Sequence, residues 1–168
     1  MNPTKRLAAV VAGALLIGLP AATFAETVVV RLKSYEEVPS VSSGASGHFK
    51  AFIDDKAPAI AYELFYEGLE GDVRQSHIHV GQTGATGGIS VFLCQTATNA
   101  DPTGLAPTCP QSGTVSGTIS PANIIGPTAQ GVAAAELNEL IAAIRAGVAY
   151  VNVHSSTFTG GEIRGQLH

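Results

Sequence analysis

The stretch AYVNVHSSTFTGGEIRGQL, residues 149–167, holds two short alternating segments joined by a connection with paired glycines. Side chains on a β-strand point alternately to opposite faces. The two valines of YVNVH therefore point toward a core, and Asn152 and His154 point the other way. In EIRGQL the same rule places Glu162 and Arg164 on the polar face. The seven-residue connection SSTFTGG predicts that the two strands form an antiparallel hairpin.

Strand patterns also fill most of the chain before this hairpin. Segments rich in β-branched and aromatic residues recur between glycine, proline and serine clusters. They cover residues 26–32, 47–54, 59–69, 76–80, 89–94 and 113–120. With the hairpin this makes eight short strands, and the helices that a parallel α/β sheet needs between strands are missing. The sequence therefore predicts an all-β Greek-key sandwich or barrel.

One helix is predicted, over residues 132–147. Its apolar residues recur at steps of three and four, with polar residues between them. They are Leu137, Leu140, Ile141 and Ile144. Gly147 suits the C-terminal cap, and Arg145 lies in the last turn, where the helix dipole favours a cation. We expect this helix to cross one end of the barrel near the C-terminus.

The first 25 residues are typical of a signal peptide. Lys5 and Arg6 precede an uncharged apolar run, and small residues follow up to Ala25, where we expect cleavage. The run is shorter than the 20 or so residues of a membrane span, and no later stretch comes near that length without interruption by polar residues. Residues 26–168 then form a single exported domain, periplasmic or secreted, with no membrane span.

The charge balance excludes some classes of partner. Without Lys5 and Arg6 of the expected signal peptide, the mature chain has 7 basic and 13 acidic side chains, and therefore a formal charge of −6. No basic run occurs. Nucleic acids and anionic lipids are therefore not expected as partners.

The two cysteines are most simply a disulfide in an exported chain. Cys94 and Cys109 bracket QTATNADPTGLAPT, a polar stretch with proline and glycine. A metal-binding pair and a redox pair are the alternatives, but the spacing lacks the C-x-x-C of either.

Three histidines form a candidate site. QSHIHVGQTG, residues 75–84, places His77 and His79 on one face of a strand, and His154 lies on the polar face of the terminal hairpin. If these strands are neighbours, the three imidazoles converge. Convergent imidazoles suit copper or zinc, and the glycines after His79 leave room for an open position.

The same residues also fit roles that need no metal. Polar residues are ordinary on an outer strand face, and His154 can form a cross-strand pair with Glu162. Arg164 is expected to pair with Glu162, which would use the carboxylate and bring a positive charge near any cation. Asn152, Glu162 and Arg164 could instead form a recognition face for a protein or a glycan. His48 and His168 receive no role.

Three motifs in this order resemble the CHRD domain, named after chordin: HIH followed by glycine, YVNVH, and GEIRGQL. LKSYEEVPSVSSGASGHFKAFID adds to the similarity, which covers nearly the whole mature chain. The resemblance implies an immunoglobulin-like β-barrel with limited similarity to copper/zinc superoxide dismutases. It implies no assigned activity. The chain departs from the family at Ser76 and at GQTGATGG, which alters the loop beside the histidines.

Together these features predict an exported binding module with an unassigned ligand, with copper or zinc as the possible metal. A copper-dependent dismutase-like enzyme and a metal-free adhesion module are the alternatives. A two-metal dismutase needs further histidines, and none lies between His79 and His154. No nucleophile and base arrangement or phosphate loop occurs, so no catalytic residue is assigned.

Overall fold

A computed structural model describes residues 26–54, 56 and 58–168. The predicted signal peptide, residues 1–25, lies outside the described residues. Within this part of the chain, no helix has the length and apolar character that a membrane crossing requires.

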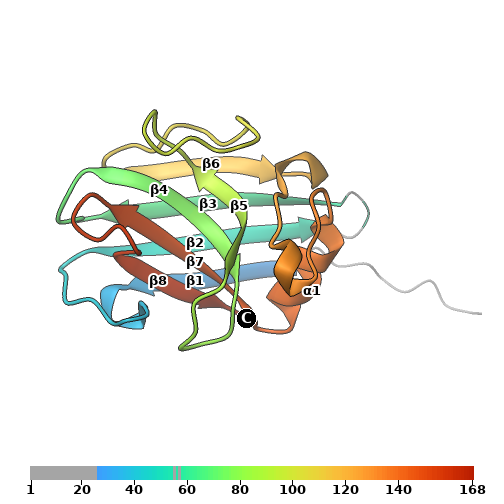
Figure 1. Cartoon of the computed structure of the whole chain (residues 1–168), viewed down its shortest axis with the longest axis horizontal. Coiled ribbons are helices and arrows are strands. Elements are labelled where there is room, and N and C mark those ends of the chain that lie inside the picture. The colour runs from blue at the N-terminus through green and yellow to red at the C-terminus, as the bar shows by residue number, and fades with distance from the viewer. Residues whose placement is uncertain (1–25, 55, 57) are drawn as a thin grey trace, which may run out of the picture.

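Eight antiparallel strands form one sheet that curls into a nearly closed barrel (Figure 1). They are β1 (Glu26–Lys33), β2 (Ser46–Asp54), β3 (Ala59–Glu67), β4 (Val73–Val80), β5 (Gly88–Cys94), β6 (Gly113–Ile119), β7 (Ala149–Ser155) and β8 (Ile163–Leu167). Their spatial order is β5-β4-β7-β8-β1-β2-β3-β6. All eight predicted strands and the β7–β8 hairpin are confirmed, with Asn152 opposite Arg164.

The two edge strands, β5 and β6, are not paired with each other, and β3, which lies beside β6, supplies side-chain hydrogen bonds across this gap. The hydroxyl of Tyr62 donates to the carbonyl of Leu93 at 2.6 Å, and the hydroxyl of Tyr66 donates to the carbonyl of Pro110. The predicted disulfide is confirmed: Cys94, at the end of β5, is bonded to Cys109. The bond ties the end of β5 to the connection that leads to β6, which begins at Gly113.

The barrel interior is filled by the inward-facing half of each strand. Its fully buried members include Phe49, Leu64, Ile78, Val151 and Ile163. Each fully buried apolar side chain of this size contributes about 1.5–3 kcal/mol through the hydrophobic effect. Because Ile78 and Val151 are fixed in the core, the residues next to them in sequence must point outward.

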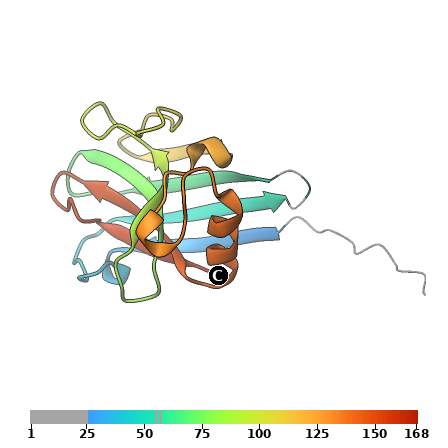
Figure 2. The same ribbon diagram turned by 45° about the vertical axis from the view of Figure 1, so that its right-hand side comes forward.

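The single α-helix described, α1 (Leu137–Arg145), covers one end of the barrel (Figure 1 and Figure 2). Its four predicted apolar residues are buried, and Gly147 adopts the left-handed conformation of a C-terminal cap, with φ 70°. The helix is shorter than the predicted 132–147. Ala135 has φ 67°, which no α-helix accommodates, so the chain turns before Leu137. Short 3-10 helices occur at Ser34–Glu36, Pro121–Asn123 and Thr128–Gln130.

Candidate metal centre

Three neighbouring strands bring the predicted site residues together. β7 pairs with β4 on one side and with β8 on the other. In this register His77 lies opposite Asn152, which in turn lies opposite Arg164, and His79 lies opposite Tyr150. His154 lies two residues beyond Asn152 on β7, opposite Gln75, and is therefore diagonal to His77. The adjacency that convergence of the histidines required is therefore present.

The three imidazoles form a compact cluster. Ring centroids are 4.9 Å apart for His77 and His154, 5.2 Å for His77 and His79, and 6.3 Å for His79 and His154. One nitrogen from each ring can be chosen so that all three lie within 4.8 Å of one another. Tetrahedral ligands at about 2.0–2.1 Å from zinc are about 3.3 Å apart, so three nitrogens that lie within 4.8 Å of one another would have to close by about 1.5 Å at most to hold one ion.

The cluster is buried, whereas the sequence suggested an outer, solvent-facing strand face. His77 is 0% exposed, His154 6% and His79 7%. Phe92 of β5 packs edge-on against His77, with 4.3 Å between ring centroids. The loop between β4 and β5, residues 81–87, covers the cluster from another side. Both faces of β7 are consequently buried.

Two backbone carbonyls fix the orientation of the imidazoles. His79 donates from Nδ1 to the carbonyl of Gly87 at 2.9 Å, and His154 donates from Nδ1 to the carbonyl of Thr159 at 2.9 Å. In a neutral ring the other nitrogen, Nε2, then carries a lone pair. Nε2 of His79 and Nε2 of His77 are buried without a hydrogen-bond partner. His79 combines both features, a carbonyl-held Nδ1 and an unpaired Nε2, which is the arrangement found around metal-binding histidines.

Burial also keeps the three rings neutral. Desolvation, followed by the neighbouring histidines, lowers the pKa of His77 to about 2. Desolvation lowers the pKa of His79 to about 4, against the opposing effect of the Gly87 carbonyl. The pKa of His154 is lowered as well, chiefly by burial. At neutral pH protons therefore do not compete with a metal ion for these nitrogens.

Asn152 lies at the centre of the cluster. Its Oδ1 is 3.0 Å from Nε2 of His154, and Nδ1 of His77 is 3.2 Å from the same nitrogen. Because Nδ1 of His154 carries the hydrogen that it donates to the carbonyl of Thr159, its Nε2 can accept a hydrogen bond from Nδ1 of His77 but cannot donate one to Oδ1 of Asn152. The space therefore collects more lone pairs than protons, which favours a cation.

Arg164 does not pair with Glu162, contrary to the sequence-based expectation. Its Nη1 donates to the carbonyl of Ala85 at 2.9 Å and its Nη2 to that of Gln82 at 3.1 Å. The guanidinium carbon lies 3.4 Å from the centre of the Tyr150 ring. The charge is thus directed toward the 81–87 loop, where it holds two carbonyls over the cluster.

Glu162 is used elsewhere, and it does not pair with His154 either. Its Oε1 accepts hydrogen bonds from the Ser43 hydroxyl at 2.6 Å and from the backbone of Glu70 at 2.9 Å. The carboxylate ties two loops to the start of β8. Asn152, Glu162 and Arg164 are at most 2% exposed. The alternative of a polar recognition face therefore has no solvent-facing surface at these three residues.

Three further residues shape the site although the sequence pattern assigned them no role. Tyr150 stacks on His79, with ring centroids 4.7 Å apart and planes 1° from parallel. Its position on the polar face of YVNVH could have indicated this contact. Phe92 follows from β5 pairing with β4. Glu37, buried beside Asn152, comes from a loop far away in the sequence, and no local pattern marks it.

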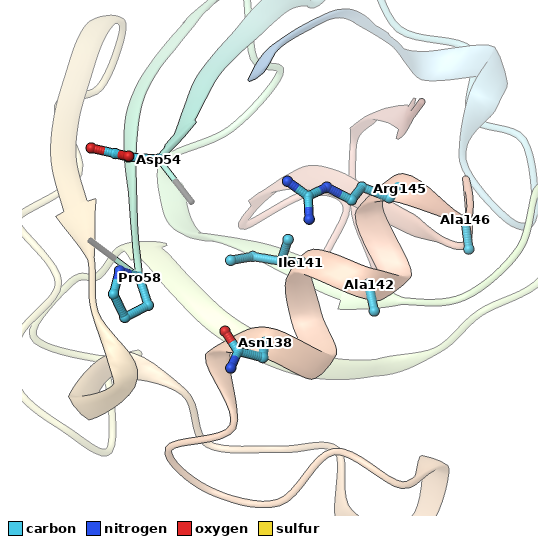
Figure 3. Close-up of a pocket in the computed structure, with 7 residues that line it drawn as sticks. All are labelled: Asp54, Pro58, Asn138, Ile141, Ala142, Arg145 and Ala146. Atoms are coloured by element: carbon cyan, nitrogen blue, oxygen red, sulfur yellow. The ribbon is translucent and has the colours of Figure 1, made fainter. Parts of the chain in front are cut away.

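The largest cavity described lies away from the histidines, at α1. It has a volume of about 520 Å³, and in Figure 3 Asn138, Ile141 and Arg145 extend from the helix toward Asp54 and Pro58. Arg145 also pairs with Glu26 at 2.7 Å, on the surface. His48 and His168 do not belong to the histidine cluster.

Comparison with known proteins adds a family to this architecture. No curated protein and no solved structure matches the chain. The family model of the CHRD domain matches residues 28–167, which begin within β1 and end at the last residue of β8. That range contains all three histidines, and the resemblance carried by HIH, YVNVH and GEIRGQL is confirmed. The chain therefore belongs to the CHRD domain family.

Proposed function

We propose that the chain is an exported binding domain that holds one transition-metal ion through His77, His79 and His154. The carrying observation is the state of these rings: all three are buried and neutral, and the Nδ1 atoms of two of them are held by backbone carbonyls. Burying imidazoles without partners for Nε2 costs free energy, because each unsatisfied polar group loses its bond to water. A bound metal ion removes that cost.

The ligand set favours copper or zinc. Neutral imidazole nitrogens suit zinc, copper and nickel, whereas magnesium and calcium prefer carboxylate and carbonyl oxygens. Three protein nitrogens leave at least one coordination position for a further ligand. This composition fits a module that captures or carries a metal ion.

Metal titration of the mature protein tests the proposal. We expect copper and zinc to bind in a 1:1 ratio, and His77→Ala and His154→Ala each to weaken binding by at least 100-fold. His48→Ala is the matched control, because it removes an imidazole outside the cluster. Wild-type affinity weaker than roughly 10 μM for both ions, about 7 kcal/mol of binding free energy, would rule the site out.

A dismutase-like activity is tested on the same material. Superoxide consumption by copper-loaded protein is measured beside metal-free protein and the His77→Ala variant. If the domain only binds metal, all three consume superoxide at the background rate. A copper-dependent rate that His77→Ala abolishes would replace binding with catalysis as the function.

Export is the second part of the proposal. We infer that residues 1–25 are removed after Ala25, and that residues 26–168 form the single mature domain. Glu26 is the first residue of β1, and its carboxylate pairs with Arg145, so the folded structure extends to the residue after the proposed cleavage site. The intact mass of protein recovered from the periplasm or medium checks this, and a mature N-terminus well inside β1 would contradict it.

A further inference from the structure

A metal ion in this cluster lacks a negative partner among its nearest neighbours. The three imidazoles are neutral, and the charged group that stacks beside them, Arg164, is a cation. Its charge is one of the causes that lower the pKa of His79, so it reaches the cluster. A buried divalent ion with only neutral ligands is costly unless an anion lies nearby.

Glu37 is a buried carboxylate in the right place. It directly follows the 3-10 helix Ser34–Glu36 and is only 5% exposed. Its Oε2 accepts a hydrogen bond from the backbone of Val38 at 3.3 Å, and no donor meets full hydrogen-bond geometry at its Oε1. Burial raises the pKa of this carboxyl, while Val38, Arg164 and the nearby Asn152 amide lower it. A buried carboxylate oxygen without a well-placed donor costs free energy of folding, and a functional role is one reason for a protein to retain it.

This oxygen faces the amide of Asn152. Both Oε1 of Glu37 and Nδ2 of Asn152 border the small space in front of Gly161. A Cβ atom at position 161 would collide with Oε1 and lie 2.9 Å from Nδ2. The glycine, buried and with φ 131°, thus allows the carboxylate and the amide to approach.

This contact determines which way the amide points. With Nδ2 toward the carboxylate, Oδ1 of Asn152 faces His154 and lies 3.0 Å from its Nε2. The reverse orientation would place two oxygens against each other at Glu37 and would direct a second N–H donor, besides that of His77, at Nε2 of His154. Glu37 therefore keeps an acceptor oxygen of Asn152 directed at the histidine cluster.

We propose that Glu37 is the acidic positioning residue of the metal site, acting through Asn152 and offsetting the charge of Arg164. The proposal rests on the proposed function and adds an anionic residue to it. The amide oxygen of Asn152 becomes an additional oxygen donor beside the three nitrogens. Partners of metal ligands typically change metal affinity by about 10- to 100-fold when they are replaced.

The test is Glu37→Gln, which keeps the shape of the side chain and removes its charge. We expect copper and zinc affinity to fall at least 10-fold and the electron paramagnetic resonance spectrum of bound copper(II) to change. Glu36→Gln is the matched control, since Glu36 precedes it in the chain and is exposed. The double variant Glu37→Gln/Asn152→Asp returns a negative charge to the Glu37–Asn152 pair. It should restore the affinity for metal to within about threefold of that of the wild type.

The outcomes separate the two proposals. If the wild type binds metal and Glu37→Gln binds it equally well with an unchanged spectrum, the role of Glu37 is wrong and the three-histidine site stands. If the wild type binds no metal, both proposals fail. Should Glu37→Gln not fold, Asn152→Ala takes its place. A 10-fold or greater loss of metal affinity in this variant supports the action of Glu37 through Asn152, and wild-type affinity overturns it.

Discussion

Acidification should destabilise the metal-free protein through its buried histidines. In the unfolded chain a histidine takes up its proton near pH 6.5. In the folded protein His77 stays neutral until about pH 2 and His79 until about pH 4. Between pH 7 and pH 5 the unfolded state therefore binds more protons than the folded state. Stability must fall as the pH falls through this window.

The magnitude follows from proton linkage. Between pH 7 and pH 5, protonation of one histidine stabilises the unfolded chain by about 2 kcal/mol. In the folded protein His77 and His79 take up almost no protons over this range, so the folded state is not stabilised in the same way. Together they remove about 4 kcal/mol from the free energy of unfolding, a large part of the roughly 5–15 kcal/mol of an ordinary domain. Glu37 acts in the opposite sense, because burial raises its pKa. The wild-type slope alone thus mixes both effects.

A variant isolates the histidine contribution. Urea unfolding is measured at pH 7 and pH 5, with a chelator present, for the wild type, His77→Gln and the control His48→Gln. The stability lost on acidification should be about 2 kcal/mol smaller for His77→Gln than for the other two proteins. Equal losses in all three, within the roughly 0.5 kcal/mol that extrapolation permits, would show that His77 is not held neutral by burial.

Two other regions of the fold give further tests. Replacing both Cys94 and Cys109 by serine opens a 15-residue loop and should lower the free energy of unfolding by about 3 kcal/mol in urea titrations; thiol labelling of the wild type under denaturing conditions should find no free cysteine. Arg164→Lys cannot reproduce the two bonds to the carbonyls of Gln82 and Ala85. It should therefore speed amide hydrogen exchange in residues 81–87, and exchange as slow as in the wild type would show that the guanidinium does not hold this loop.

The strands and the β7–β8 hairpin could be predicted because alternation and a short connection are local signals, whereas the pairing of β4 with β7 could not, because it joins segments far apart in the sequence. Val151 and Val153 alternate with Asn152 and His154, and the register of the hairpin follows from its short connection. The length of the helix could not be predicted, since an alanine side chain gives no signal for the positive φ of Ala135, whose backbone amide donates to the carbonyl of Ile124.

The surroundings of the histidines depended on long-range packing. Alternation indicates which face a side chain occupies but not what covers that face. The coverage comes from the 81–87 loop and from Glu37, and both depend on loop conformations that a strand pattern does not encode. For the same reason the expected pairing of Arg164 with Glu162 was wrong: neighbours on one strand face met partners from two different loops.

Both faces of β7 are buried, so the histidines stand on strands while a separate loop covers them. In most sites built from loops, the same segment both holds the ligand and covers it. His77, His79 and His154 stand on paired central strands, which exchange with solvent only in large opening events. The 81–87 loop reaches them through a few side-chain and backbone bonds and can open at a smaller cost. In the proposed metal site the strands would therefore set the spacing of the three ligands, whereas the loop would set the orientation of His79, through the Gly87 carbonyl, and the rate at which an ion enters or leaves.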